Sequence, residues 1–288
     1  MIPGAFEYHR PTSLDEAVTL LTKYGDDGRV IAGGHSLIPM MKLRLAVPAH
    51  LIDLRDVGGL ADISEKGGTI TIGAMTTQHD VIGSDLLAKS VPILRETALL
   101  IADPQVRYFG TIGGNVANGD PGNDMPAVMQ CLDARYLLHG PKGEREVPAR
   151  DFYEAAFFTA MAEDEVLAAI RVPVPPKGSG QAYEKLKRKV GDYATAAAAV
   201  ALVVEGGKCS QASIALTNLG ATPLFAEAAA EALIGTAVDE AAIAKAADAA
   251  RKITDPASDL RGPADYRIHV AGVMVARAIG SALARATG

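Results

Sequence analysis

The chain has 288 residues, of which 49% are hydrophobic and 22% are charged, and its formal net charge is −6. This composition is typical of globular proteins and excludes disordered, collagen-like and coiled-coil chains. The acidic balance argues against a nucleic-acid-binding protein, which would carry a basic surface. A chain of this length is expected to form two or three compact units rather than one small core.

The two cysteines, Cys131 and Cys209, lie far apart in the sequence. Two thiols cannot supply the four ligands of a typical iron–sulfur cluster, and neither has a second cysteine at zinc-site spacing. We interpret both as buried reduced thiols. The N-terminus shows no signal-peptide pattern, and the most apolar stretch, Ala194 to Val204, is shorter than the roughly 20 residues of a membrane helix. We therefore expect a soluble cytoplasmic protein.

The first 57 residues predict a small parallel βαβ unit. Ser13-Leu14-Asp15-Glu16 is a capping box that begins a helix, and Gly25 ends it. Residues 29–32 form a short apolar strand, residues 37–43 a helix, and residues 50–54 a second strand. Two strands joined by a crossover helix pair in parallel.

The rest of the chain predicts mostly antiparallel strands followed by helices. Strands are expected at 68–73 and 165–172, and a hairpin joins 134–138 to 144–147. The Pro- and Gly-rich stretch 173–180 is the clearest linker. Beyond it we expect three strands and then three helices, at residues 182–187, 195–205, 208–216, 222–235, 239–252 and 264–286. The sequence thus predicts an α+β chain divided into residues 1–176, with subdomains of about 1–57 and 58–176, and residues 177–288.

The first glycine segment, Ala32-Gly33-Gly34-His35-Ser36, lies between the expected strand and the helix that starts at Leu37. A dinucleotide pyrophosphate is held by converging backbone N–H groups, and glycine permits that close approach. The segment lacks the third glycine of a Rossmann fingerprint and the lysine of a P-loop, which disfavours a nucleoside triphosphatase. Taken alone, an ordinary strand-to-helix turn explains it equally well.

The second segment, Phe109 to Asp124, carries five glycines in sixteen residues around Thr111-Ile112-Gly113-Gly114-Asn115. We interpret it as a long loop, which is costly in conformational entropy unless it wraps a ligand. Thr111 and Asn115 could donate to phosphate or ribityl oxygens, and Asp124 could accept from a hydroxyl. The alternative is a disordered surface loop. Together the two segments predict a clamp on one extended dinucleotide.

Several motifs resemble the FAD-binding subunit of the molybdenum hydroxylases, a family that includes xanthine dehydrogenases and aerobic carbon monoxide dehydrogenases. They are the Gly-Gly-x-Ser and Thr-Ile-Gly-Gly-Asn segments, Pro121, Asp124, Phe6 to Pro11, Leu51 to Leu54, Lys185 and Asp192-Tyr193-Ala194. The resemblance runs from end to end. Within the family, Ala32 to Lys42 and Ala102 to Arg107 are most similar to the medium subunit of carbon monoxide dehydrogenases.

The resemblance implies a fold and a set of partners. The fold is a two-subdomain FAD-binding region of the vanillyl-alcohol-oxidase/PCMH type, followed by a C-terminal domain with a three-stranded antiparallel sheet and a helical bundle. The cofactor is non-covalent FAD. The partners are a small subunit with [2Fe–2S] clusters and a large subunit with the molybdenum cofactor, in a dimer of heterotrimers. Electrons leave through FAD to an external acceptor such as a quinone, at the inner face of the cytoplasmic membrane.

The resemblance also implies a set of cofactor-binding residues, with no catalytic residue and no metal ligand on this chain. The set is Ala32, Gly33, Gly34, His35, Ser36, Leu37, Thr111, Ile112, Gly113, Gly114, Asn115, Asp124, Lys185 and Tyr193. Lys185 would lie at the N1–C2 edge of the flavin, with a solvated surface charge as the alternative. Tyr193 would cover the ring, with a core tyrosine as the alternative.

Some residues are left open. His35 contacts a phosphate or only covers the cofactor, and Asp120 turns to solvent or tunes the flavin. Arg107 is a candidate contact to the cofactor or a neighbouring subunit. The remaining histidines lack metal-ligand spacing and are interpreted as structural or surface residues; they are His9, His50, His79, His139 and His269.

Three functions are compatible with these features. The favoured one is an electron-relay flavoprotein subunit of a molybdenum hydroxylase, of the carbon monoxide type or of a related purine, aldehyde or aromatic hydroxylase. The second is a free-standing FAD oxidoreductase, which would need an acid or base facing the flavin. The third is a non-enzymatic nucleotide-binding or assembly subunit, which would be colourless.

Overall fold

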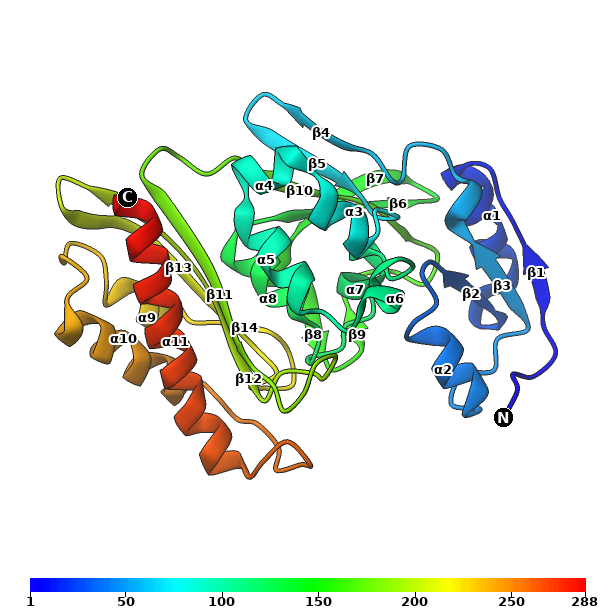
Figure 1. Cartoon of the computed structure of the whole chain (residues 1–288). Coiled ribbons are helices and arrows are strands. Elements are labelled where there is room, and N and C mark those ends of the chain that lie inside the picture. The colour runs from blue at the N-terminus through cyan, green and yellow to red at the C-terminus, as the bar shows by residue number, and fades with distance from the viewer.

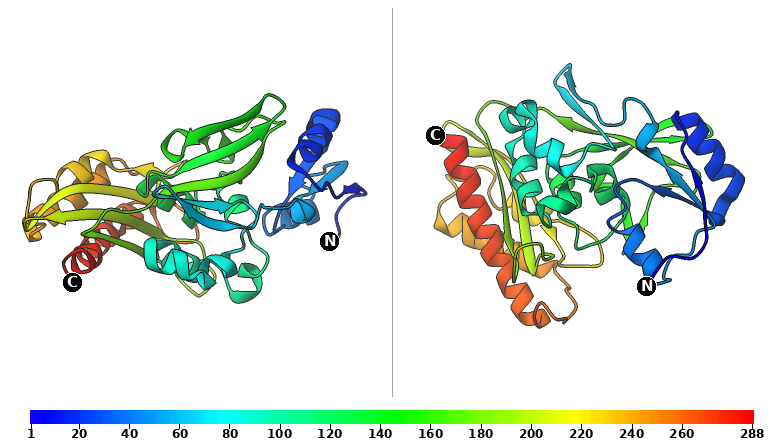
Figure 2. Two further views of the ribbon diagram at one scale, coloured as in Figure 1. Left: turned by 90° about the horizontal axis from the view of Figure 1, so that it is seen from above. Right: turned by 45° about the vertical axis from the view of Figure 1, so that its right-hand side comes forward.

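The computed structural model describes residues 1–288 and arranges them in three parts along the long axis of the molecule. A small sheet with its helices lies at the N-terminal end, a five-stranded sheet covered by helices lies in the middle, and a third sheet crossed by the last helix lies at the C-terminal end (Figure 1). Figure 2 shows the same order from two further sides.

The N-terminal part is the predicted parallel βαβ unit with one further strand. Its elements are β1 (Glu7–His9), α1 (Leu14–Tyr24), β2 (Gly28–Ile31), α2 (Leu37–Lys42) and β3 (His50–Asp53). The strand order is β1-β3-β2, and both pairings are parallel. Ala17, Val18 and Leu21 on one face of α1 are buried in one cluster with Ile52 of β3, which holds the helix on the sheet.

The middle part is an antiparallel sheet in the order β4-β5-β10-β6-β7, with the predicted β6–β7 hairpin at one edge. The strands are β4 (Ile63–Lys66), β5 (Thr69–Gly73), β6 (Arg135–Gly140), β7 (Gly143–Pro148), β10 (Val166–Pro173) and the separate pair β8 (Tyr153–Ala155) and β9 (Phe158–Thr159). The helices are α3 (Gln78–Gly83), α4 (Asp85–Ser90), α5 (Pro92–Leu100), α6 (Pro104–Arg107), α7 (Ile112–Ala117) and α8 (Asp124–Cys131).

The prediction of a long irregular loop over residues 109–124 is wrong. Thr111 caps α7 by accepting from Gly114 N at 3.0 Å, and α8 begins at Asp124, so ordered helix occupies much of the segment. The glycines concealed this because glycine is a poor helix former, whereas here tertiary contacts override propensity. The four helices of residues 78–107 were also not foreseen.

The C-terminal part contains the three predicted strands β11 (Ser179–Leu186), β12 (Ala196–Glu205) and β13 (Lys208–Thr217). The helix expected from Thr222 is wrong in its start: residues 224–225 form β14 (Leu224–Phe225) beside β13, and α9 (Glu227–Glu231) follows. The helices α10 (Glu240–Lys252) and α11 (Ala264–Thr287) agree with expectation. The linker is shorter than expected, because β10 ends at Pro173 and β11 starts at Ser179.

The helix α11 is long and apolar enough to cross a membrane by length and composition alone. Half of its most apolar window is buried inside this domain, where α11 lies across β11 and β12. A Cβ at Gly180 would overlap the carbonyl oxygen of Ala282, so the helix backbone contacts the strand backbone directly. The helix is therefore a core element of the C-terminal sheet.

One face of the C-terminal sheet also belongs to the core of the middle part. Tyr183, Ala197 and Ala215 are buried in the same hydrophobic cluster as Ile72 and Met129. The other face and α11 form a second cluster. Both cysteines are free and buried, which confirms the prediction. The C-terminal part is thus packed against the middle part through a shared hydrophobic core, and this contact sets the position of β11 relative to α8.

Candidate functional site

The first glycine segment forms an open turn at the carboxyl end of β2. Gly34 has a positive φ of 75°, and the backbone N–H groups of residues 33–37 donate to no acceptor within the chain. The Ser36 side chain makes no capping bond to α2. Consecutive N–H groups that lack an internal partner are suited to bind an anion.

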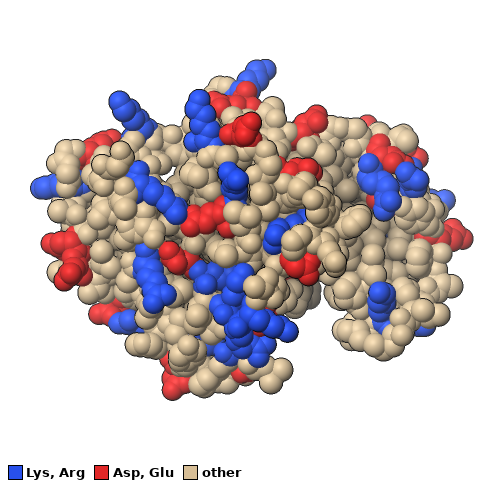
Figure 3. All heavy atoms as spheres, viewed as in Figure 1, with Lys and Arg blue, Asp and Glu red and all other residues tan.

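The two glycine segments touch each other through their backbones. A Cβ at Gly33 would overlap the carbonyl oxygen of Phe109 and lie 2.8 Å from Cα of Gly110. The imidazole of His35 and the ring of Phe109 are 6.3 Å apart between centroids. Only glycine allows this approach, so segments distant in sequence form one surface. Figure 3 shows a notch between the N-terminal part, on the right, and the rest of the molecule.

The second glycine segment uses its own N–H groups internally. Ile112 N donates to Thr76 O and Gly113 N to Ala74 O, both at 2.9 Å, and Asn115 N donates to Thr111 O at 3.0 Å. The Oδ1 atom of Asn115 accepts from Met125 N at 3.3 Å. Thr111, Ile112 and Gly113 are buried, and only Gly114 and Asn115 are partly exposed. What this segment can still offer a ligand is therefore side-chain atoms.

Asp124, at the start of α8, is buried and paired with the C-terminal part. Its carboxylate accepts from the Tyr183 hydroxyl at 2.6 Å and from Lys185 Nζ at 2.7 Å. Burial raises the pKa of Asp124, and the charge of Lys185 opposes that rise. The Lys185 side chain is only 1% exposed, so it is not the solvated charge considered above. The structure thus brings two predicted site residues together as partners of each other.

Tyr193 lies at the rim of the same region. It is 40% exposed, so it is not a core tyrosine, and its hydroxyl donates to Asp120 Oδ2 at 3.2 Å. Burial and the carboxylate of Asp120 raise the pKa of Tyr193 to about 12. A Cβ at Gly122 would lie 2.8 Å from the Tyr193 ring, so this glycine makes room for the ring. Asp120 therefore holds Tyr193 and the turn at Gly122, whose N–H it accepts at 2.9 Å.

Basic side chains gather around the C-terminal end of α5. Lys185 Nζ and Lys187 Nζ each donate to Leu100 O at 3.3 Å, and Arg107 donates to Ile101 O at 2.9 Å. Carbonyl groups at a helix end attract cations. Burial and neighbouring Lys185 lower the pKa of Lys187. Figure 3 shows a group of Lys and Arg side chains over the ends of β11 and β12. Lys187 directly follows β11 in the chain.

Three residues that matter to this geometry were not singled out from the sequence. Tyr183 contacts Asp124, Asn123 Nδ2 donates to Asn115 O at 2.7 Å, and Gly122 accommodates Tyr193. Tyr183 and Lys185 lie two residues apart on one strand, so their side chains share a face of the sheet. This spacing could have indicated that both face the middle part. Nothing local in the sequence indicates the other two contacts.

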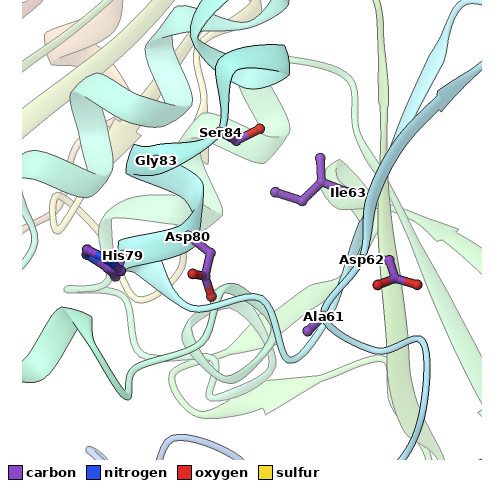
Figure 4. Close-up of a pocket in the computed structure, with 7 residues that line it drawn as sticks. All are labelled: Ala61, Asp62, Ile63, His79, Asp80, Gly83 and Ser84. Atoms are coloured by element: carbon purple, nitrogen blue, oxygen red, sulfur yellow. The ribbon is translucent and has the colours of Figure 1, made fainter.

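Two open depressions lie elsewhere on the surface. One, of about 390 Å³, is lined by residues 61–63 and by α3 residues including His79 and Asp80 (Figure 4). Asp80 is occupied there in a capping box with Thr77. The other lies between α1 and the β6–β7 hairpin. Neither depression is lined by a residue of the glycine segments. We place the candidate site at the segments because the N–H groups of residues 33–37 have no acceptor within the chain.

Comparison with protein families gives two matches. Residues 4–175 match the FAD binding domain in molybdopterin dehydrogenase, and residues 181–282 match the CO dehydrogenase flavoprotein C-terminal domain. The chain is 65% identical to the carbon monoxide dehydrogenase medium chain of Afipia carboxidovorans and 51% identical to that of Hydrogenophaga pseudoflava, covering 99% of both chains in each case. It is 38% identical to the 6-hydroxypseudooxynicotine dehydrogenase complex subunit alpha of Paenarthrobacter nicotinovorans, over 99% of this chain and 97% of the relative.

Solved structures show the same similarity. A chain of the reconstituted CO dehydrogenase from Oligotropha carboxidovorans superposes with a TM-score of 0.98 at 65% identity, covering 99% of this chain and 100% of that one. A chain of quinoline 2-oxidoreductase from Pseudomonas putida 86 gives a TM-score of 0.95 at 36% identity, with full coverage of both.

Proposed function

The chain belongs to the FAD-binding subunits of the molybdopterin dehydrogenases, and from this premise we propose that it is the electron-transfer subunit of a carbon monoxide dehydrogenase. One observation carries the cofactor assignment: the turn at residues 33–37 presents N–H groups without an internal acceptor, and it is held open by the backbone contact between Gly33 and Phe109. A pyrophosphate is the ligand that such a turn fits.

The proposed cofactor contacts follow from what each segment offers. Residues 32–37 would hold the pyrophosphate, and the partly exposed side chain of Asn115 would contribute beside it, while the buried Thr111 supports the segment by capping α7. His35 is exposed at the same turn, where it can reach a phosphate oxygen or cover the cofactor. The partly exposed ring of Tyr193 is available to cover the flavin. When bound, FAD supplies the redox chemistry, while the protein fixes its position and surroundings.

Asp124 and Lys185 are better placed to shape the site than to contact FAD directly. Their side chains are 6% and 1% exposed and satisfy each other, so contact with a ribityl hydroxyl or a flavin edge would require the pair to open. We propose that the pair fixes α8, and with it Asn123 and Asn115, against β11. Removing one partner of a buried charge pair is strongly destabilising, because the other charge is left without compensation.

The partners are proposed from the relatives and from the surface. The relatives are medium chains and subunits of multi-subunit dehydrogenases. Large apolar side chains are exposed along α2 and the segment after it, namely Ile38, Met40, Leu43, Leu45 and Val47. An apolar patch of this kind is typical of a protein interface. We propose a small [2Fe–2S] subunit and a large molybdenum subunit as partners, in a dimer of heterotrimers that is cytoplasmic and meets a quinone at the inner membrane face.

A second candidate function is supported by the relative that is 38% identical, which is the alpha subunit of a 6-hydroxypseudooxynicotine dehydrogenase complex. In this candidate the chain serves a related hydroxylase, whose substrate site lies on another subunit. Purification of the native complex separates the two. We expect FAD, iron, molybdenum and copper with carbon monoxide-dependent dye reduction; molybdenum without copper and turnover of an aromatic substrate would favour the second candidate.

The relay assignment itself is tested on the isolated chain. It should be yellow, bind FAD at one molecule per chain, and show no turnover of carbon monoxide until the partner subunits are added. Robust carbon monoxide oxidation by the chain alone would contradict the relay, and a colourless protein that does not take up added FAD would contradict the cofactor.

A further inference from the structure

Three potential metal ligands meet on the N-terminal sheet, away from the glycine segments. His9 Nε2 lies 3.1 Å from His50 Nδ1, and Glu7 Oε2 lies 3.5 Å from His50 Nδ1 and 4.0 Å from His9 Nε2. The two imidazoles are about four-fifths buried, whereas the Glu7 carboxylate is 73% exposed. Two largely buried ring nitrogens and one exposed, adjustable carboxylate oxygen thus lie within 4.8 Å of one another.

The parallel pairing of β1 and β3 creates this cluster. Glu7 and His9 are two residues apart on β1 and project from the same face of the sheet. His50 is the register partner of Glu7 on β3, so its side chain joins them on that face. His9 and His50 are distant in sequence, which explains why spacing alone gave no sign of a metal site.

We propose that Glu7, His9 and His50 form a site for a divalent transition-metal ion, with Zn²⁺ as the ion that fits best and water completing the coordination. Tetrahedral Zn²⁺ with nitrogen ligands at the usual bond length places neighbouring ligand atoms about 3.3 Å apart. The observed separations of 3.1, 3.5 and 4.0 Å are close to that spacing, so small rotations of the two imidazoles and of the exposed Glu7 side chain would direct all three atoms at one ion. Two imidazoles with one carboxylate are a known ligand set for Zn²⁺, whereas Ca²⁺ and Mg²⁺ prefer oxygen ligands alone.

The surroundings of the cluster favour a cation. Tyr24, the last residue of α1, stacks on His50 with ring centroids 3.6 Å apart and planes inclined by 13°. It therefore fixes the imidazole and brings the C-terminal end of α1 to the cluster. The C-terminus of a helix carries partial negative charge, which attracts a positive ion.

The site is separate from the glycine segments. Glu7, His50 and Gly28 are register partners at the starts of their strands, while residues 32–36 follow the end of β2. The bound ion would join β1 to β3, the only strand with which β1 pairs. It would act as a cross-link that retains the three-residue edge strand, because metal binding couples to folding when its ligands come from separate segments.

Titration of the full-length chain, prepared without a histidine tag, tests the proposal. Co²⁺ serves as the probe because tetrahedral Co²⁺ gives intense visible bands, and Zn²⁺ should displace it. We expect one ion per chain, a higher midpoint of thermal unfolding with Zn²⁺, and slower hydrogen exchange of residues 7–9. Binding should weaken roughly tenfold or more in His50→Ala and His9→Ala, because loss of even an outer-shell partner of a metal ligand costs about 10–100-fold in affinity.

Two further variants keep the test independent of folding. Glu7→Gln changes an exposed side chain, so the chain should fold normally and yet bind Co²⁺ more weakly. His269→Ala removes an exposed histidine outside the cluster and should bind as the unchanged chain does. Visible bands that are absent, or that are equally strong in the His9→Ala/His50→Ala double variant, would overturn the proposal and leave the cluster as a hydrogen-bonded histidine pair.

Discussion

The two glycine segments look alike in sequence and behave differently in the structure. The backbone N–H groups of residues 33–37 have no acceptor within the chain. Those of residues 112–115 donate to Thr76, Ala74 and Thr111. The first segment is therefore the one that we propose as the binding surface, and the second is a largely buried junction that supports it. Glycine content alone does not distinguish the two cases, because glycine serves both ligand approach and close packing.

Gly33→Ala is expected to have the largest effect on this comparison. The added Cβ overlaps the carbonyl oxygen of Phe109, which is backbone and cannot rotate away, so the two segments must separate. We expect loss of nearly all bound FAD and a fall in unfolding free energy of about 1–3 kcal/mol, as for other overpacked sites. The ratio of flavin to protein absorbance after desalting measures the first, and urea unfolding the second.

Gly114→Ala is the matched control for Gly33→Ala. The added Cβ would lie 2.9 Å from Thr111 Oγ1, a side-chain atom, and 3.7 Å from Cβ of Ala32. The Thr111 side chain can adjust, so this variant should retain much of its FAD. Equal flavin loss in both variants would show that the two segments contribute alike and would break the comparison.

Asp124→Asn is expected to be the most destabilising change in the second glycine segment. It leaves the ammonium of Lys185 buried without its counter-charge, which costs roughly 3–5 kcal/mol when a buried pair is broken. Urea unfolding should show that loss, and adding Lys185→Met should recover part of it. If the single variant remains as stable as the unchanged chain but loses FAD, Asp124 contacts the cofactor directly and the positioning role is wrong.

Thr111→Ala removes the N-cap of α7, because the hydroxyl oxygen of Thr111 accepts a hydrogen bond from Gly114 N. Loss of an N-cap costs about 1 kcal/mol. We therefore expect a measurable drop in the unfolding midpoint of the flavin-free protein. The change in FAD affinity should be smaller than in Ser36→Ala. An unchanged midpoint would mean that the buried junction does not depend on this cap.

Ser36→Ala gives the smallest expected change in stability. In contrast to Thr111→Ala, it should lower FAD affinity more than stability. Ser36 makes no capping bond, so the unfolding free energy of the flavin-free protein should shift by less than about 0.5 kcal/mol. FAD affinity should fall severalfold, because the hydroxyl lies in the turn that we assign to the pyrophosphate. Fluorescence titration with FAD provides the measurement. Unchanged affinity would indicate that the backbone alone holds the cofactor.

Much of the architecture could be predicted because it follows from local patterns. The capping residue Ser13, the β6–β7 hairpin, the strands β11 to β13 and the helices α10 and α11 all have periodic or turn signals in the sequence. The errors fall where tertiary contacts decide. Leu224–Phe225 becomes a strand because β13 offers an edge, and a glycine-rich stretch becomes α7 because Ala74 and Thr76 accept its first N–H groups.

The sequence by itself determined the α+β class and the family, and it predicted that the two glycine segments bind a dinucleotide. Only the tertiary structure decided which of these segments has free N–H groups, that Asp124 and Lys185 pair with each other, and that His9 and His50 meet. The physical reason is the range of the interactions. Periodicity and capping depend on neighbours in the chain, whereas hydrogen-bond satisfaction and charge pairing depend on whatever the fold brings within about 3 Å.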